Sequence, residues 1–188
     1  MFRRKTKMEQ YPIHKEKYYL TGETFHCFMR DRLAKDLKRE KNGYKLTSLA
    51  MFIVAAVVLG VVYLGNNLSL RDDFVWAILP IAMVFLGIAN LNKVRTAEKG
   101  LDNKIMRDYT TQNFAKYQIS VKFYEDMLVY DKGDKKEELQ YNAFRKFYEG
   151  EKYFAIYFQT GEIVIFNPNC KKDKIKEVFA NYVKSVKE

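Results

Sequence analysis

The stretch that decides the fold reads LTSLAMFIVAAVVLGVVYLGNNLSL at Leu46–Leu70 and FVWAILPIAMVFLGIANLN at Phe74–Asn92. Only the segment Arg71-Asp72-Asp73 separates the two apolar runs. A bilayer core about 30 Å thick requires roughly 20 apolar helical residues, which each run can supply. Neither run shows the polar face at helical spacing that is typical of a helix on a soluble core. The pattern therefore predicts a transmembrane hairpin of two helices over residues 46–92.

The charges on either side of this hairpin predict its orientation. Thirteen Lys and Arg stand before Leu46 against six acids, and basic residues resume with Lys93, Arg95 and Lys99. Short flanks rich in Lys and Arg stay on the cytoplasmic side of a membrane. We therefore expect a multi-pass membrane protein, with both termini cytoplasmic and residues 65–73 facing outward.

The hairpin itself carries few polar groups. The most polar side chains are Thr47 and Ser48, near the inner boundary. An ion or proton pathway would ordinarily need stronger polar groups inside the spans, so the sequence predicts an anchor. Pro80 predicts a kink in the second span. Ala56 and Gly60 stand four residues apart, and either they form a helix-packing face or they reflect the usual abundance of small residues in membrane helices.

The first 45 residues predict a cytoplasmic strand and an amphipathic helix. A strand is expected within Glu9–Leu20, where tyrosines and Ile13 alternate with charges. Thr21 is then a candidate N-cap with an acid in the first turn, and apolar residues recur every three or four positions until Asn42-Gly43, where we expect the helix to end. The chain thus divides into residues 1–45, the hairpin 46–92, a juxtamembrane helix 93–116 and a cytoplasmic domain 117–188.

Over residues 117–188 the sequence pattern predicts a cytoplasmic domain with a sheet followed by a helix. Apolar and polar residues alternate from Tyr117 onward, and turn signals separate about six short strands, which indicates an antiparallel meander. The helical spacing returns over Lys172–Val186, whose apolar stripe can close one open side of a curved sheet. The expected fold class is an α+β membrane protein.

The order of these elements is similar to that of the YcxB-like family of bacterial membrane proteins. The residues that carry the resemblance are Ile119–Asp126 (ISVKFYED), Tyr141–Tyr148, the aromatic strand Tyr153–Phe158 and the strand end Ile163–Pro168 (IVIFNP). The resemblance implies two spans and a cytoplasmic domain similar to the pleckstrin-homology-like fold, which the N-terminal strand could join as a further strand of the later sheet. It implies no activity and no site residues.

The sequence favours binding over catalysis, and we expect no enzyme and no cofactor. Cys27 and Cys170 fall on the cytoplasmic side, where thiols stay reduced, and His14 and His26 are too few for a zinc site or a conventional triad. No glycine-rich phosphate loop is present. The basic residues behind the net charge of +10 are interspersed with acids, and this pattern argues against nucleic-acid binding.

Two functions from different classes remain open. The preferred one is a membrane-anchored interaction module that recruits or regulates a protein partner, alone or as a homo-oligomer. Its candidate surface is aromatic, although a core role is the competing interpretation, and consists of Tyr141, Phe144, Phe147 and Tyr148. The alternative is a binder of anionic lipid headgroups, for which solvated loop charge is the competing interpretation. Its candidate contacts are Lys132, Lys135, Lys136, Lys171, Lys172 and Lys174.

Overall fold

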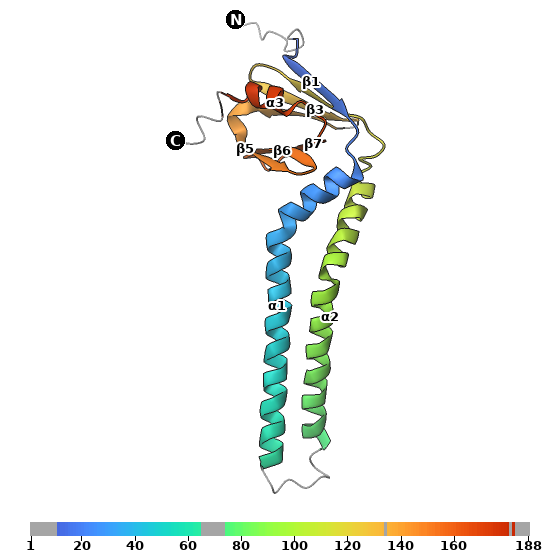
Figure 1. The fold of residues 1–188 in the computed structure, drawn as a ribbon, viewed down its shortest axis with the longest axis vertical. Helices are drawn as coiled ribbons and strands as arrows, with labels where there is room; N and C mark the ends of the chain where they lie inside the picture. The colour runs from blue at the N-terminus through green and yellow to red at the C-terminus, as the bar shows by residue number, and fades with distance from the viewer. Residues whose placement is uncertain (1–10, 65–73, 134, 181, 183–188) are drawn as a thin grey trace, which may run out of the picture. The chain divides into compact units, whose positions relative to one another are not determined.

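The computed structural model describes residues 11–64, 74–133, 135–180 and 182 (Figure 1). The predicted outer loop at 65–73 and the last residues of the predicted C-terminal helix lie outside this part. The chain divides into two compact units. Unit 1 is formed by Met1–Asp31 with Ile105–Glu188, and unit 2 is formed by Arg32–Lys104.

Two long helices account for unit 2 and for short parts of unit 1. They are α1 (Gly22–Leu64) and α2 (Phe74–Thr111). The expectation that the amphipathic helix ends at Asn42-Gly43 is wrong, because α1 continues through both residues. A single glycine costs a helix only about 1 kcal/mol, and the helix-favouring residues on both sides outweigh that cost. The predicted helix after the second span is likewise continuous with it in α2.

Seven strands in the described part of unit 1 form two antiparallel sheets. The first sheet has the order β1 (His14–Tyr18), β2 (Ile119–Phe123), β3 (Met127–Lys132) and β4 (Lys135–Gln140). The second has the order β5 (Phe144–Gly150), β6 (Tyr153–Phe158) and β7 (Ile163–Phe166). The six predicted C-terminal strands are present, and the N-terminal strand joins them, since Lys15 pairs with Lys122 in the β1–β2 register.

The prediction of one continuous meander needs correction. A short 3-10 turn, η1 (Tyr141–Ala143), interrupts the chain between β4 and β5 and starts a new sheet. Tyr141 in this turn is buried, so its side chain anchors the turn to the core. The fold class is α+β, with two long apolar helices and two antiparallel sheets.

Aromatic rings fill the core of unit 1. Phe123 from the first sheet stacks on Phe166 from the second, with 6.3 Å between ring centroids, and Phe166 also contacts Phe154 at 5.8 Å. The helix α3 (Lys172–Val178) follows β7 and contributes the buried Ile175 (Figure 1). Phe179, directly after α3, is fully buried and lies 6.5 Å from Phe123. These contacts place an aromatic core between the two sheets.

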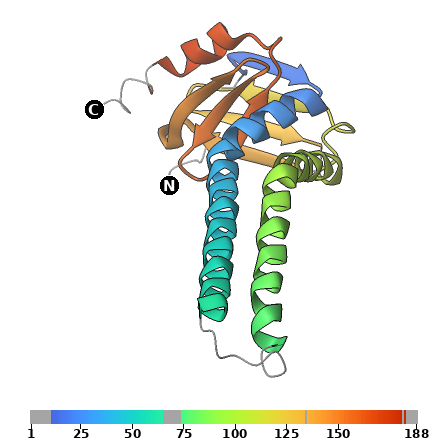
Figure 2. The same ribbon diagram turned by 60° about the horizontal axis from the view of Figure 1, so that its bottom comes forward.

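Unit 2 is a pair of helices that run side by side (Figure 2). The Ser48 hydroxyl donates a hydrogen bond of 2.8 Å to the Gly87 carbonyl oxygen, and the ring of Phe52 lies where a Cβ on Gly87 would stand. Ala55 is buried beside this contact, whereas Ala56 is exposed. The helix seam therefore uses Ser48, Ala55 and Gly87, and the packing interpretation of Ala56 does not hold.

The apolar surface of unit 2 is largely uncovered. Both helices are long and apolar enough to cross a membrane, and only 11% of each apolar window is buried. The exposed side chains include Leu46 at 69%, Val57 at 59% and Phe85 at 68%. A helix that belongs to a soluble core would bury most of this surface, so its exposure favours a lipid environment.

Candidate functional site

The predicted aromatic surface lies mainly in the core. Tyr141 and Phe144 are buried, and their rings contact Phe179 at 4.5 and 5.0 Å. Phe147 is half-buried and contacts Phe144 at 4.8 Å. Tyr148 is the most exposed of the four, at 38%. The core interpretation is therefore the one that holds for Tyr141 and Phe144.

A register shift in β5 explains why Phe144 and Phe147 share the core. Strict alternation would place two residues three apart on opposite faces of a strand. The β5–β6 pairing shifts between Phe144 and Lys146, so that Phe144 pairs with Phe158 and Phe147 pairs with Ile156. One extra residue in β5 thus returns both rings to the same face.

The predicted lipid-contact lysines lie on different elements. Lys132 ends β3, and its ammonium group lies 3.6 Å from the ring centroid of Phe114, a cation–π contact. Lys135 and Lys136 are exposed at the start of β4. The remaining three stand before or within α3, where Lys171 and Lys174 are exposed and Lys172 is half-buried.

A surface groove of about 480 Å³ brings the first sheet and α3 together. Its wall includes Ile13 and His14 at the start of β1, Glu125 in the β2–β3 turn, and a row from the C-terminal segment. That row consists of Lys174, Glu177, Val178 and Tyr182. We call these seven residues the end groove. The end groove thus combines charges of both signs with apolar side chains.

The β1 side of the end groove is held by polar contacts to the segment after β7. Glu16 accepts a hydrogen bond of 2.7 Å from His14 and one of 3.3 Å from the backbone N–H of Lys171. The side-chain amide of Asn167 donates to the Tyr19 carbonyl at 2.7 Å. Its oxygen accepts from the backbone N–H of Thr21 at 3.5 Å. The strand end Phe166-Asn167-Pro168 therefore binds the connection between β1 and α1.

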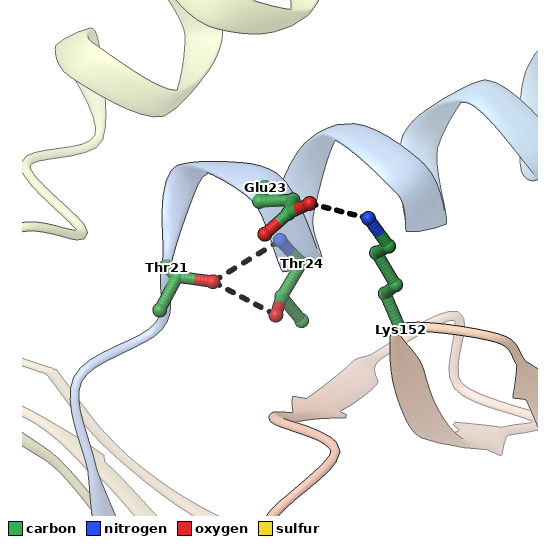
Figure 3. A network of polar contacts seen from close by, with 4 residues as sticks. All are labelled: Thr21, Glu23, Thr24 and Lys152. Carbon is green, nitrogen blue, oxygen red and sulfur yellow. Dashed lines mark hydrogen bonds and ion pairs between the residues drawn. The ribbon is translucent and has the colours of Figure 1, made fainter.

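The first turn of α1 is fixed to the second sheet by polar side chains (Figure 3). As predicted, Thr21 is the N-cap: its hydroxyl oxygen accepts a 3.1 Å hydrogen bond from the Thr24 backbone N–H. Glu23 pairs with Lys152 at 2.5 Å, and this hydrogen bond lowers the pKa of Glu23 and raises the pKa of Lys152. The hydroxyl of the buried Tyr153 donates to Asp31 at 2.8 Å.

Unit 2 has a cavity of its own, of about 560 Å³, between the charged halves of its two helices. Leu37 and Tyr44 line it from α1, and Lys93 and Leu101 line it from α2. The Lys93 ammonium group lies 5.6 Å from the ring centroid of Tyr44. These side chains keep the helices paired outside the apolar segment.

The metal-ligating side chains of the described residues do not cluster. Among the described residues no group of three His, Cys, Asp or Glu could hold a metal ion. Cys27 and Cys170 are free thiols. Burial raises the pKa of Cys170 to about 11, which disfavours the thiolate that a nucleophile requires.

Comparison with known proteins returned no match to any family model, curated protein or solved structure.

Proposed function

We propose that the chain is a YcxB-like protein of a bacterial cell membrane, with α1 and α2 spanning the bilayer and both termini in the cytoplasm. The exposed apolar side chains of unit 2 and the basic residues that flank them support this placement. We also propose that unit 1 is a pleckstrin-homology-like domain. Two antiparallel sheets of four and three strands, with a helix after the last strand, support that assignment.

Within this framework the protein is an interaction module that recruits or regulates a partner protein at the cytoplasmic face. The end groove is the observation that carries the proposal. It is open to solvent, it has exposed apolar and charged side chains such as Ile13 and Glu177, and it is built from both ends of unit 1. It replaces the predicted surface around Tyr141 and Phe144, whose rings are already occupied in the core.

Crosslinking from single positions tests the partner in the native membrane. A photoreactive amino acid would replace Ile13 or Glu177 in the groove, or Lys135 and Asn142 as exposed controls outside it. We expect one adduct of discrete mass from both groove positions and none from the controls. No adduct at native expression, or the same adduct from all four positions, would contradict the proposal.

A second candidate function, contact with anionic lipid headgroups, is favoured by a different observation. Lys15, Lys17 and Lys122 gather on one face of the first sheet, a set that the predicted lysines did not include.

A further inference from the structure

The outer face of β1 carries an exposed row of basic and apolar side chains. Positions 11, 13, 15, 17 and 19 are all exposed, whereas 14, 16, 18 and 20 are half-buried or buried. The exposed fractions reach 60% for Ile13 and 55% for Tyr19. Lys15 and Lys17 lie between them, so the strand presents two lysines flanked by apolar groups.

The neighbouring strand adds a third lysine to this face. Lys122 on β2 stands directly opposite Lys15, and Ser120 stands opposite Lys17. Like charges opposite one another destabilise a sheet. In the described part of the chain none of these three ammonium groups is in an ion pair. We call Ile13, Lys15, Lys17, Tyr19 and Lys122 the lysine face.

Asp131 on β3 is an acid on the same side of the sheet. It stands opposite Ser120 and diagonally from Lys122, and one strand, β2, separates it from Lys17, a distance of about 10 Å at the usual strand spacing. Asp131 is itself opposite Lys136 on β4. Repulsion from Lys17, then burial and repulsion from Lys122, lower the pKa of Lys15. An anion at this face would relieve that repulsion.

We propose that the lysine face is a peripheral membrane-contact surface, in which the three lysines meet phosphate groups of anionic phospholipids while Ile13 and Tyr19 enter the headgroup layer. This inference rests on the proposed membrane placement. The lysine face shares Ile13 with the end groove, but Lys15, Lys17, Tyr19 and Lys122 lie outside the groove. Lysine is depleted in protein–protein interfaces, whereas lysine beside apolar and tyrosine side chains is typical of interfacial membrane binding.

Two further features support a lipid surface as the occupant. Lysines on an edge strand can simply block pairing with another strand, but Lys122 lies on the interior strand β2, where that role does not arise. In unit 2, only residues 32–45 and 93–104 stand outside the predicted spans, and helices of that length reach about 20 Å. Such a short tether would keep unit 1 at a high effective concentration near the headgroups.

The test is lysine acetylation of the full chain, read residue by residue by mass spectrometry. The chain is placed in nanodiscs of phosphatidylcholine alone or of phosphatidylcholine mixed with phosphatidylglycerol. At about 0.1 M salt we expect acetylation of Lys15, Lys17 and Lys122 to slow about tenfold in the anionic discs, and to recover at about 1 M. Lys135 and Lys136 should react equally in both discs.

Matched variants separate the lysine face from net charge. The triple variant K15Q/K17Q/K122Q and the control K135Q/K136Q/K171Q each lose three charges. A fluorophore on Tyr11→Cys, quenched by spin-labelled lipid, should lose its contact with anionic discs only in the first variant. Equal quenching in the two variants, or equal acetylation in both disc types, would overturn the proposal.

Two controls identify the reason for a negative result. In the first control, glycerol phosphate is added to the chain in neutral discs. If it protects the three lysines and anionic lipid has no further effect, the ligand is a soluble phosphate and the lipid assignment is overturned. Co-elution of the chain with the discs tests the membrane placement separately. A chain that enters the discs but shows no protection contradicts the lysine face alone.

Discussion

The two units of this chain place the same kinds of side chain in opposite surroundings. In unit 1, Phe154 and Phe166 are fully buried between two sheets, whereas in unit 2, Phe85 is 68% exposed on a helix. Charges decorate the surface of unit 1 and are absent from the apolar half of unit 2. The difference teaches that unit 1 folds around its own core, whereas unit 2 leaves most of its apolar surface uncovered, as the proposed bilayer placement requires.

Removal of an aromatic ring from the core of unit 1 should have the largest effect on stability. Phe166→Ala removes contacts to the rings of Tyr18, Phe123 and Phe154, and buried Phe-to-Ala changes cost about 3–5 kcal/mol. We expect that loss in the free energy of unfolding of unit 1, measured by near-UV circular dichroism in urea. Phe85→Ala is the control, and a comparable loss there would mean that unit 2 is packed like a soluble core.

A charge in the middle of a span should have the next largest effect. Val57→Lys places an ammonium group on an exposed apolar site of α1, at a cost of about 2.5–3.5 kcal/mol for a lysine at the bilayer centre. We expect a smaller fraction of inserted chains in a membrane-insertion assay. Leu46→Lys, at the predicted boundary, should insert nearly normally because its side chain reaches the interface. Equal insertion of both variants would argue against a bilayer around α1.

Alkaline pH should weaken unit 1 through its buried tyrosines. Burial, aided by Glu137, raises the pKa of Tyr130 to about 12, and burial likewise raises the pKa of Tyr18 and Tyr153. Because the folded state favours the neutral phenol, this stability is complete below about pH 10 and is lost as pH rises through 12, roughly 2 kcal/mol for Tyr130. The part of the tyrosinate absorbance that belongs to the buried tyrosines should therefore appear late and together with unfolding. Ionisation of all 14 tyrosines near pH 10 with the fold intact would contradict the burial.

A bulkier residue in the helix seam should have the smallest effect. A Cβ on Gly87 would stand 2.7 Å from the Phe52 ring, so Gly87→Val should destabilise the helix pair by about 1–2 kcal/mol in an SDS titration. Gly60→Val is the matched control, because a Cβ there meets nothing within 4 Å. A seam built on Gly60 would reverse the order of the two variants.

Periodicity and composition predicted most of the fold. Apolar length identified the two helices, alternation together with turn signals and aromatic runs identified the strands, and the Thr21 cap marked the start of α1. The break between the sheets at Tyr141 escaped prediction because a buried 3-10 turn resembles a strand end in sequence. The seam at Ser48 and Gly87 escaped because Ala56 and Gly60 carry an equally good small-residue signal.

The candidate site was less accessible to sequence reasoning than the fold. The end groove joins residues from both ends of the chain, and the lysine face depends on the register that sets Lys15 opposite Lys122. Until the pairing of β1 with β2 is known, the sequence shows only dispersed lysines. The alternation of Ile13, Lys15, Lys17 and Tyr19 was the one local signal that pointed to an exposed basic strand.

The most direct measurement of the central claim, a membrane hairpin with unit 1 on the cytoplasmic side, is cysteine labelling in intact cells. Single cysteines would replace Tyr11 in unit 1 and Asn67 in the predicted outer loop, with the native chain as the background for Cys27 and Cys170. A membrane-impermeant maleimide should label Asn67→Cys in intact cells and Tyr11→Cys only after permeabilisation. Labelling of both positions from the same side would contradict the account.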